Sequence, residues 1–375
     1  MSDTEKSAPL AGIKVVELAR ILAGPWAGQT LADLGADVVK VEGPDGDDTR
    51  NWGPPFVERD DGSKDAAYFH ATNRGKSSIR ADFSDPADVK RVRALIAEAD
   101  VVIENFKQGS LKRFGLDYEA VSRDNPRLVY CSITGFGQDG PYAKRAGYDF
   151  IIQGMSGIMD LTGEPDGPPQ KIGVAYADIL TGLYAVIGIQ AALRQREMTG
   201  RGQLVDMALF DVMVGTLANQ AMNALVGGKN PKRMGNAHPN IAPYEAFRAK
   251  DGWLIVAVGN ERQFVRFSEV IDLPAREEWA SNARRVKNRE SLSASVARRI
   301  AEWGREELLA RLEGANVPAG PINSVKQALA DPQIAAREMV VDLSDGLQGL
   351  RTPIRFSNAE LTLGRPSPMK PTAED

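Results

Sequence analysis

GIKVVELARILAGPWAGQTLADLGADVVKVE, residues 12–42, is the stretch that decides the fold. It begins and ends with β-rich runs, GIKVVEL and ADVVKVE, and both runs predict strands. Between them, apolar residues recur at helical spacing, with Pro25 in a favourable first-turn position and Gly35 as a natural helix stop. The order strand, helix, strand predicts a parallel sheet covered by helices.

The same alternation continues to about residue 225. Helical patterns occupy 85–100 and 210–225, and strand patterns occupy 101–106 and 127–137. A loop at 196–203 leads into one more strand. We therefore predict an α/β protein whose large domain has a parallel sheet and comprises residues 1–225 and 331–375.

The pattern changes after residue 226. YEAFRAKDGWLIVAVG (244–259) contains two strand runs around Asp251-Gly252, which is a strong hairpin signal. Helical patterns follow at 261–271, 289–303 and 305–314, and a Gly/Pro-rich connection follows at 314–324. These patterns predict a smaller α+β domain over residues 226–330.

Composition excludes several classes of protein. The chain has 46 basic and 50 acidic residues, a net charge of −4, and no long basic run, so no nucleic-acid partner is expected. Its one cysteine cannot form an intramolecular disulfide, and one cysteine with two histidines makes a metal site unexpected. The glycines at 24, 28 and 35 do not match G-x-G-x-x-G, which disfavours a nicotinamide dehydrogenase.

Two further features bear on location. The start of the chain, MSDTEKSAPLAG, is polar and lacks the apolar core of a signal peptide. The longest uncharged apolar run, 179–193, is shorter than the roughly 20 residues that span a bilayer. We therefore expect a soluble, cytoplasmic protein with no membrane partner.

KIGVAYADILTGLYAVIGIQAAL, residues 171–193, places Asp178 before fifteen residues without a charge. The pattern predicts a buried helix, and aspartate is a common helix N-cap. The position also suits chemistry, because the positive end of the helix dipole would keep a poorly hydrated carboxylate ionised. An ionised carboxylate can act as a nucleophile. The residues alone leave both interpretations open.

Two other segments offer groups for binding an anionic ligand. In GDDTRNWGPPF (46–56), Arg50 and Trp52 provide an ion-pairing group and an aromatic wall, which suit a small acid. In VIENFKQGSLKRFG (102–115), polar and aromatic residues follow a strand, where parallel sheets bind ligands. Its basic residues suit a phosphate, although a solvated helix edge explains them equally well. Outside these segments, no Ser/His or Cys/His pairing is visible.

Taken together and in order, the motifs resemble the family III CoA transferases, which include formyl-CoA transferase and carnitine CoA transferase. The resemblance runs from about residue 9 to 365 through PLAGIKVVEL, AGPWAGQTLADLGADVVKVE, GDDTRNWGPP, NRGKSSI, VIENF, GSLKRFGLDYE, SITGFGQDGP, RAGYD, TGEPDGPP, the Asp178 stretch, TGRGQ, GNAHPNIAPY and VPAGPIN. The run YCSITGFGQDGP…RAGYD…GVAYADILTGLYA is most similar to the branch that uses succinyl-CoA with a dicarboxylate acceptor.

This resemblance implies a mechanism and a set of site residues. Asp178 would attack an acyl-CoA thioester to form an aspartyl anhydride and then an aspartyl-CoA thioester, with CoA as substrate and no permanent cofactor. Tyr148 would lie near the thioester, and Trp52 near the acyl group. The residues implied to contact CoA are Leu22, Ala23, Asn105, Phe106 and Arg113. The implied fold is a Rossmann-like large domain with a small domain, in a homodimer of two interlocked rings.

The chain departs from the family pattern at three places. Gly43 stands where an arginine is frequent, Ser84 stands where a lysine is common, and the tail LGRPSPMKPTAED lacks the usual final segment. Two alternatives stay open. An α-methylacyl-CoA racemase would need a histidine at Tyr148, whose phenol has an ordinary pKa near 10 and suits a base poorly. A non-catalytic acyl-CoA-binding relative is the other alternative.

Overall fold

The computed structural model describes residues 7–58 and 62–372. Half of the polar start on which the prediction of no signal peptide rests, residues 1–6, lies outside them. The chain divides into two compact units. The first comprises Met1–Ile158, Lys171–Val226 and Pro332–Asp375, and the second comprises Met159–Gln170 and Gly227–Asp331.

The first unit is built on a parallel sheet of six strands. These are β1 (Lys14–Glu17), β2 (Asp37–Glu42), β5 (Ser77–Arg80), β6 (Val101–Glu104), β7 (Val129–Thr134) and β8 (Leu204–Ala208). Their order across the sheet is β5-β2-β1-β6-β7-β8, and every neighbouring pair is parallel. Numbered within this sheet alone, the order is 3-2-1-4-5-6, that of a Rossmann fold, so the predicted parallel sheet is confirmed.

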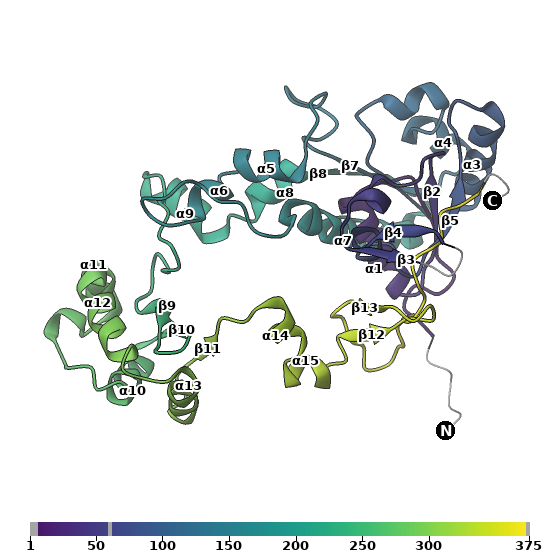
Figure 1. The fold of residues 1–375 in the computed structure, drawn as a ribbon. Helices are drawn as coiled ribbons and strands as arrows, with labels where there is room; N and C mark the ends of the chain where they lie inside the picture. The colour runs from purple at the N-terminus through teal and green to yellow at the C-terminus, as the bar shows by residue number, and fades with distance from the viewer. Residues whose placement is uncertain (1–6, 59–61, 373–375) are drawn as a thin grey trace. The chain divides into compact units, whose positions relative to one another are not determined.

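Helices cover both faces of this sheet, as Figure 1 shows. On one face, α1 (Ala23–Asp33) and α7 (Tyr176–Thr199) pack on side chains such as Val15 and Ile103. On the other face, α3 (Pro86–Glu98) and α4 (Tyr118–Asp124) pack on side chains such as Val16 and Val102. Successive strand residues alternate between the two cores, as the two-residue period of a strand requires.

The remaining elements of the first unit are short. They are η1 (Asp48–Asn51), β3 (Phe56–Glu58), β4 (Lys64–Ala66), α2 (Ala67–His70), η2 (Ser110–Phe114), α5 (Asp149–Met155), α8 (Leu209–Gly215), α9 (Ala218–Gly227), α15 (Pro332–Ala336), β12 (Val340–Asp342) and β13 (Gln348–Leu350). The single helix predicted at 210–225 is wrong, because α8 ends at Gly215 and Ala218 takes a left-handed backbone with φ of 46°. Gly215, the last residue of α8, is the local signal for this break, and the prediction of one continuous helix overlooked it.

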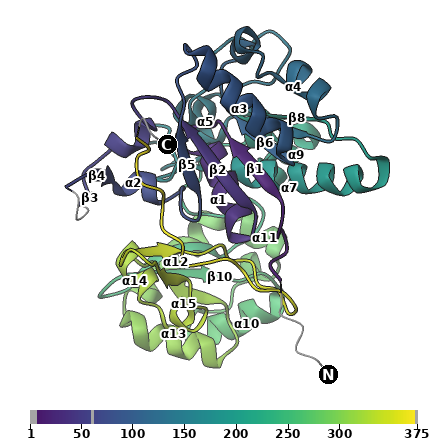
Figure 2. The same ribbon diagram turned by 90° about the vertical axis from the view of Figure 1, so that its right-hand side faces the viewer.

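The second unit has an antiparallel sheet in the order β11-β10-β9, with helices gathered beside it (Figure 2). Its elements are β9 (Tyr244–Arg248), β10 (Trp253–Ala257), α10 (Glu261–Val270), η3 (Glu277–Trp279), α11 (Asn282–Lys287), α12 (Arg289–Ile300), α13 (Arg305–Gly314), β11 (Ala319–Pro321) and α14 (Val325–Leu329). The short helix α6 (Ile158–Leu161) begins with the last residue of one segment of the first unit and continues into the second. The predicted hairpin is confirmed, whereas the predicted connection at 314–324 contains β11. The domain bounds predicted from the sequence stay a prediction, and the contacts add Met159–Gln170 to this unit.

Helix α7 is the one helix of the described residues that is long and apolar enough to cross a membrane. The uncharged apolar run that the sequence shows, 179–193, is shorter than α7. Within the first unit, however, α7 contributes Ala177, Ala185 and Ile189 to the core, all of them fully buried. Length and composition therefore match a membrane span, while the packing is that of a core helix.

Candidate active site

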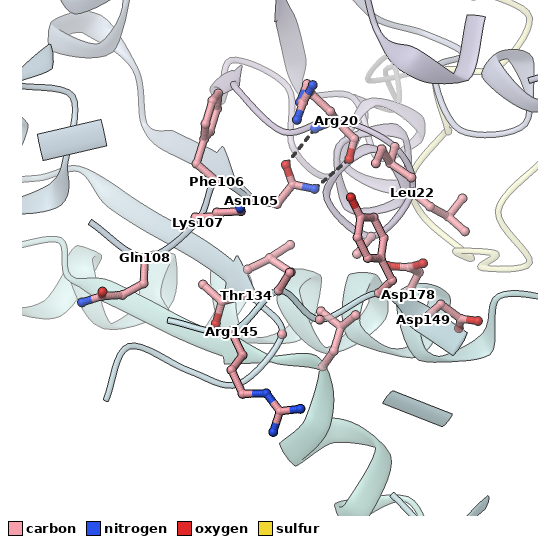
Figure 3. A pocket seen from close by; sticks show the side chains of 18 of the residues that line it. Arg20, Leu22, Asn105, Phe106, Lys107, Gln108, Thr134, Arg145, Asp149 and Asp178 are labelled. Atoms are coloured by element: carbon pink, nitrogen blue, oxygen red, sulfur yellow. Dashed lines mark hydrogen bonds between the residues drawn. The ribbon is translucent and has the colours of Figure 1, made fainter. Parts of the chain in front are cut away.

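A cavity of about 330 Å³ lies in the first unit at the carboxyl ends of the central strands (Figure 3). Its walls come from the segments that follow β1, β6 and β7 and from the first turn of α7. Because the strand order reverses between β1 and β6, the cavity lies at the topological switch point. That is where open parallel sheets bind their ligands.

Six of the nine site residues predicted from the sequence line this cavity. They are Leu22, Ala23, Asn105, Phe106, Tyr148 and Asp178. Three cationic side chains line it as well: Arg20, Lys107 and Arg145. Positive charge at this place suits an anionic ligand such as a phosphate ester. None of these three cations was predicted as a site residue from the sequence, although Lys107 lies in the basic segment 102–115.

The turn between β1 and α1 is held from outside. Asn105 accepts a hydrogen bond from the Arg20 amide at 2.9 Å and donates one to the Arg20 carbonyl at 2.7 Å, both drawn in Figure 3. The next residue, Ile21, has a left-handed backbone with φ of 72°, which is rare for a β-branched residue. Asn105, predicted to contact CoA, therefore uses its amide group to shape the wall of the cavity.

Asp178 is the third residue of α7 and not its N-cap, so the cap interpretation is wrong. The N-cap is Ala175, which makes no side-chain cap hydrogen bond. Instead, the Asp149 carboxylate accepts a hydrogen bond from the Ala177 amide at 2.9 Å. The buried side chain of Gln153 donates to the other Asp149 oxygen at 2.9 Å. A carboxylate from another segment thus takes the role of the helix cap and leaves Asp178 free.

The electrostatic surroundings of Asp178 differ from the expectation. Burial, and then the charge of Asp149, raise the pKa of Asp178 to about 7. Figure 3 shows the two carboxylates close together beside the cavity. Even in a partly buried site, a helix dipole contributes at most about 2 kcal/mol, which is less than the roughly 4 kcal/mol that corresponds to a pKa raised from 3.8 to about 7. The dipole therefore does not hold the pKa of Asp178 in its usual range.

The phenol of Tyr68 interacts electrostatically with this acidic pair. Burial raises the pKa of Tyr68, and the charges of Asp178 and Asp149 raise it further. The centres of the Trp52 and Tyr68 rings lie 5.4 Å apart, and the rings meet edge-on. Trp52 is therefore linked to the acids through the Tyr68 ring. The sequence predicted neither Tyr68 nor Asp149 as a site residue: DAAYFH carries no motif, and Asp149 stands in the quoted motif RAGYD.

Arg50 lies outside the cavity. It is buried, and its guanidinium pairs with Glu42 at 2.6 Å and with Asp65 at 2.9 Å. The same group stacks on the Phe69 ring at 3.6 Å. A guanidinium committed in this way has no open edge for a substrate carboxylate, which corrects the prediction that Arg50 binds the acid.

Arg113 does not line the cavity either. It is exposed in η2, and its guanidinium lies 4.5 Å from the centre of the Phe114 ring. Ser110, at the start of the same short helix, does line the cavity. A contact between Arg113 and CoA stays a prediction.

The parallel sheet and the cavity, which is lined by an acidic side chain and three cations, are compatible with several classes of enzyme. Comparison with known protein families identifies the class. The sequence model of CoA-transferase family III matches residues 10–371. The chain therefore belongs to CoA-transferase family III, and the predicted family and enzyme class are confirmed.

Particular relatives narrow the class. The chain is 56% identical to the succinate–glutarate CoA-transferase of Agrobacterium fabrum, over 96% of this chain and 92% of that protein. It is 41% identical to the succinyl-CoA:glutarate CoA-transferase of Homo sapiens, over 98% of this chain and 85% of that protein. Among solved structures, a CAIB/BAIF family protein from Brucella suis aligns with a TM-score of 0.89 and 61% identity, over 97% of both chains.

Proposed function

We propose that this enzyme transfers coenzyme A from succinyl-CoA to a free dicarboxylic acid, with glutarate as the first acceptor to test. The observation that carries the proposal is the Asp178 carboxylate in a cavity that is also lined by three cationic side chains. Relatives that are 56% and 41% identical over nearly the whole chain are named for transfer between succinate and glutarate.

The proposed reaction begins with the ionised Asp178. Its carboxylate attacks the thioester carbonyl, the C–S bond breaks, and CoA thiolate leaves a succinyl–aspartyl anhydride. The thiolate then attacks the aspartyl carbonyl, which releases succinate and forms an aspartyl-CoA thioester. The acceptor carboxylate then attacks the aspartyl-CoA thioester, which releases the thiolate and forms a glutaryl–aspartyl anhydride. The thiolate attacks the glutaryl carbonyl of this anhydride, which gives glutaryl-CoA and free Asp178. Each step exchanges one acyl bond for another, so no phosphate donor is consumed.

The surroundings of Asp178 suit both halves of this cycle. A carboxylate with a pKa of about 7 is a stronger nucleophile than one with an ordinary pKa, and enough of it is ionised at neutral pH. Asp149 supplies part of this shift and also orders the first turn of α7. Both carboxylates act electrostatically on the Tyr68 phenol, and in this proposal the phenol donates a hydrogen bond to an oxygen that becomes negative.

In this proposal CoA lies along the segments that follow β1 and β6. The backbone of Leu22 and Ala23, the Phe106 ring and the Arg113 guanidinium contact CoA, and Tyr148 lies beside the thioester. Trp52, whose ring contacts the Tyr68 ring, lies near the acyl group. Asn105 acts by holding the turn that carries Leu22, as its two hydrogen bonds to Arg20 indicate.

We also propose that the working form is a homodimer, as the resemblance to interlocked rings implies. Within the first unit, large apolar side chains stay exposed on three helices. Phe150 on α5 is 60% exposed, Ile187 on α7 is 61% exposed, and Leu225 on α9 is 79% exposed. Exposed apolar surface of this kind marks interaction sites. Light scattering after size-exclusion chromatography tests this, and a monomer at micromolar concentration would contradict it. The cytoplasmic location stays a prediction.

The test of the function is a donor–acceptor panel without ATP. Purified enzyme is incubated with succinyl-CoA and glutarate, and mass spectrometry should find glutaryl-CoA and succinate in equal amounts. Acetate and a branched monocarboxylate serve as acceptors that should give little product. Absence of transfer with every donor, together with deuterium exchange at the α-carbon of a 2-methylacyl-CoA, would favour the racemase alternative instead.

A further inference from the structure

Four charged side chains form a buried cluster in the first unit, here called the buried quartet: Glu17, Lys40, Asp47 and Lys76. The Lys40 ammonium lies 3.1 Å from Glu17 and 2.8 Å from Asp47, and the Lys76 ammonium lies 2.8 Å from Glu17. None of the four side chains is appreciably exposed to solvent. They come from four of the motifs quoted above, and the proposed chemistry uses none of them.

Four further hydrogen bonds join the quartet to the backbone of one turn, residues 19–25. Lys40 donates to the Ala19 carbonyl at 2.9 Å, and Lys76 donates to the Pro25 carbonyl at 2.9 Å. Between these points, the Ile21 amide donates to the two Asp47 oxygens at 3.3 and 3.4 Å. The quartet is therefore hydrogen-bonded to the turn at both ends and in the middle, and Asn105 is hydrogen-bonded to the backbone of Arg20.

This turn needs such support. Ile21 holds a left-handed backbone that a β-branched residue resists unless its surroundings enforce it. The next two residues, Leu22 and Ala23, line the cavity and begin α1, whose first turn has no side-chain cap. Free amides at a helix start stabilise negative charge only if they stay in place.

The opposite side of the turn is set by Gly182, one helical turn after Asp178 in α7. A Cβ atom at Gly182 would lie 2.7 Å from the Ala23 carbonyl oxygen, so the backbone of the turn touches α7 at this glycine. The turn is thus fixed against the helix that carries Asp178 on one side and by the quartet on the other.

Stability alone is a weak reason for burying such a cluster, since replacing buried ion pairs with apolar residues is often neutral or stabilising. We propose that the buried quartet is a positioning device that fixes the strained turn, and with it the Leu22 and Ala23 backbone, against the acyl-CoA at Asp178. This inference rests on the proposed function. Positioning of this kind is effective, because a misplacement of about 1 Å can cost on the order of 100-fold in rate.

A charge-balanced double variant tests the proposal. Lys40→Met with Asp47→Asn removes one cation and one anion, so no buried charge is left without a partner. The matched control, Asp33→Asn with Arg74→Met, removes another buried pair of the same unit, whose atoms lie 2.5 Å apart at the far end of α1. The measurements are kcat and KM for succinyl-CoA and glutarate, the melting temperature, and amide hydrogen exchange of residues 19–25.

We expect kcat of the quartet variant to fall at least about tenfold and residues 19–25 to exchange faster, whereas the control keeps kcat within about twofold at a similar melting temperature. A folded quartet variant with unchanged kcat and exchange would overturn the proposal, as would an equal loss of kcat in the control. If the double variant does not fold, Asp47→Asn alone decides by the same two readouts, because it can still accept the hydrogen bonds from Thr49.

Hydrogen exchange also separates this inference from the proposed function. If the wild-type enzyme transfers no CoA between the tested acids, the proposed substrates are wrong, but faster exchange in residues 19–25 would still support the quartet's grip on the turn. Adding Ile21→Gly to Asp47→Asn sharpens the test. Glycine adopts a left-handed backbone without strain, so part of the lost kcat should return. A merely structural role of the quartet predicts no such recovery.

Discussion

Two groups of carboxylates in the first unit have opposite electrostatic surroundings. Glu42 and Asp47 are buried, which raises their pKa values, but hydrogen bonds and charge from Arg50 and Lys40 outweigh this effect, so both pKa values lie below their usual range. Asp178 is half-buried; desolvation raises its pKa as well, and the charge of another carboxylate, Asp149, raises it further. Among the described residues, no cation is a cause of this shift.

The difference shows how one fold can separate structural acids from the acid that we propose to react. Glu42 and Asp47 are ionised and paired with buried cations, so they hold the backbone in place and stay unreactive. Asp178 has a raised pKa beside the cavity, and such perturbed groups are typical of functional sites. The placement of cations, more than burial itself, distinguishes the two groups.

The largest expected effect comes from removing the reactive acid. Asp178→Ala should lower transfer on the order of 10⁴-fold or more, because the covalent intermediates lose their attachment point. The fold should persist, since Asp178 caps no helix. The assay is glutaryl-CoA formation followed by mass spectrometry. As a control, Asp37→Ala changes an exposed aspartate at the amino end of β2 and should leave transfer unchanged. Transfer near the wild-type rate in Asp178→Ala would remove Asp178 from the mechanism.

Breaking a neutralised pair should act on stability instead. Arg50→Met removes the guanidinium that is hydrogen-bonded to the buried Glu42 carboxylate and ion-paired with Asp65, and it should cost about 3–5 kcal/mol of unfolding free energy. Urea unfolding at pH 7 measures it. Arg194→Met, which breaks an exposed pair with Glu197, should cost at most about 1 kcal/mol. Equal losses in the two variants would mean that the buried cluster is not held by these ion pairs.

The pH dependence of stability gives a third test. An acid whose folded pKa is raised to about 7 keeps its proton better in the folded state, so it makes folding less favourable as pH rises from about 4 to 7. Asp178→Ala removes this penalty. Its stability relative to wild type should therefore rise by roughly 2–3 kcal/mol between pH 5 and pH 8. Subtracting wild type cancels the other titrating groups. A difference that stays constant with pH would mean an ordinary pKa at Asp178.

The sequence predicted the sheet and the position of Asp178 well because both follow from local patterns. β-rich runs and helical spacing mark β1, α1 and β2, and the uncharged stretch after Asp178 marks the core helix α7. The break before Ala218 was missed although Gly215 marks the end of α8. The strand β11 was missed because it has only three residues and forms by pairing with β10, which is distant in the sequence. The charge partners were missed for the same reason. Arg50 reads as a ligand-binding arginine in GDDTRNWGPPF, and only the structure shows the Glu42 and Asp65 carboxylates around it.

The smallest expected effect concerns the partner acid. Asp149→Asn removes the negative charge that raises the pKa of Asp178, while the amide oxygen can still accept the hydrogen bond from Ala177. The acidic limb of the kcat/KM profile should move to lower pH. At pH 7 the gain in ionised Asp178 is at most about twofold, because about half is ionised already.

The pH at which the acidic limb of the kcat/KM profile lies decides whether Asp149 raises the pKa of Asp178. A disturbed start of α7 would instead lower the rate equally at every pH. Gln153→Leu tests that disturbance, since it removes the donor to Asp149 and leaves the charge in place. It should lower the rate without moving the limb toward acid pH. A limb that does not move in Asp149→Asn would show that burial alone sets the pKa of Asp178, and the contrast between the two groups of acids would then rest on their cations only.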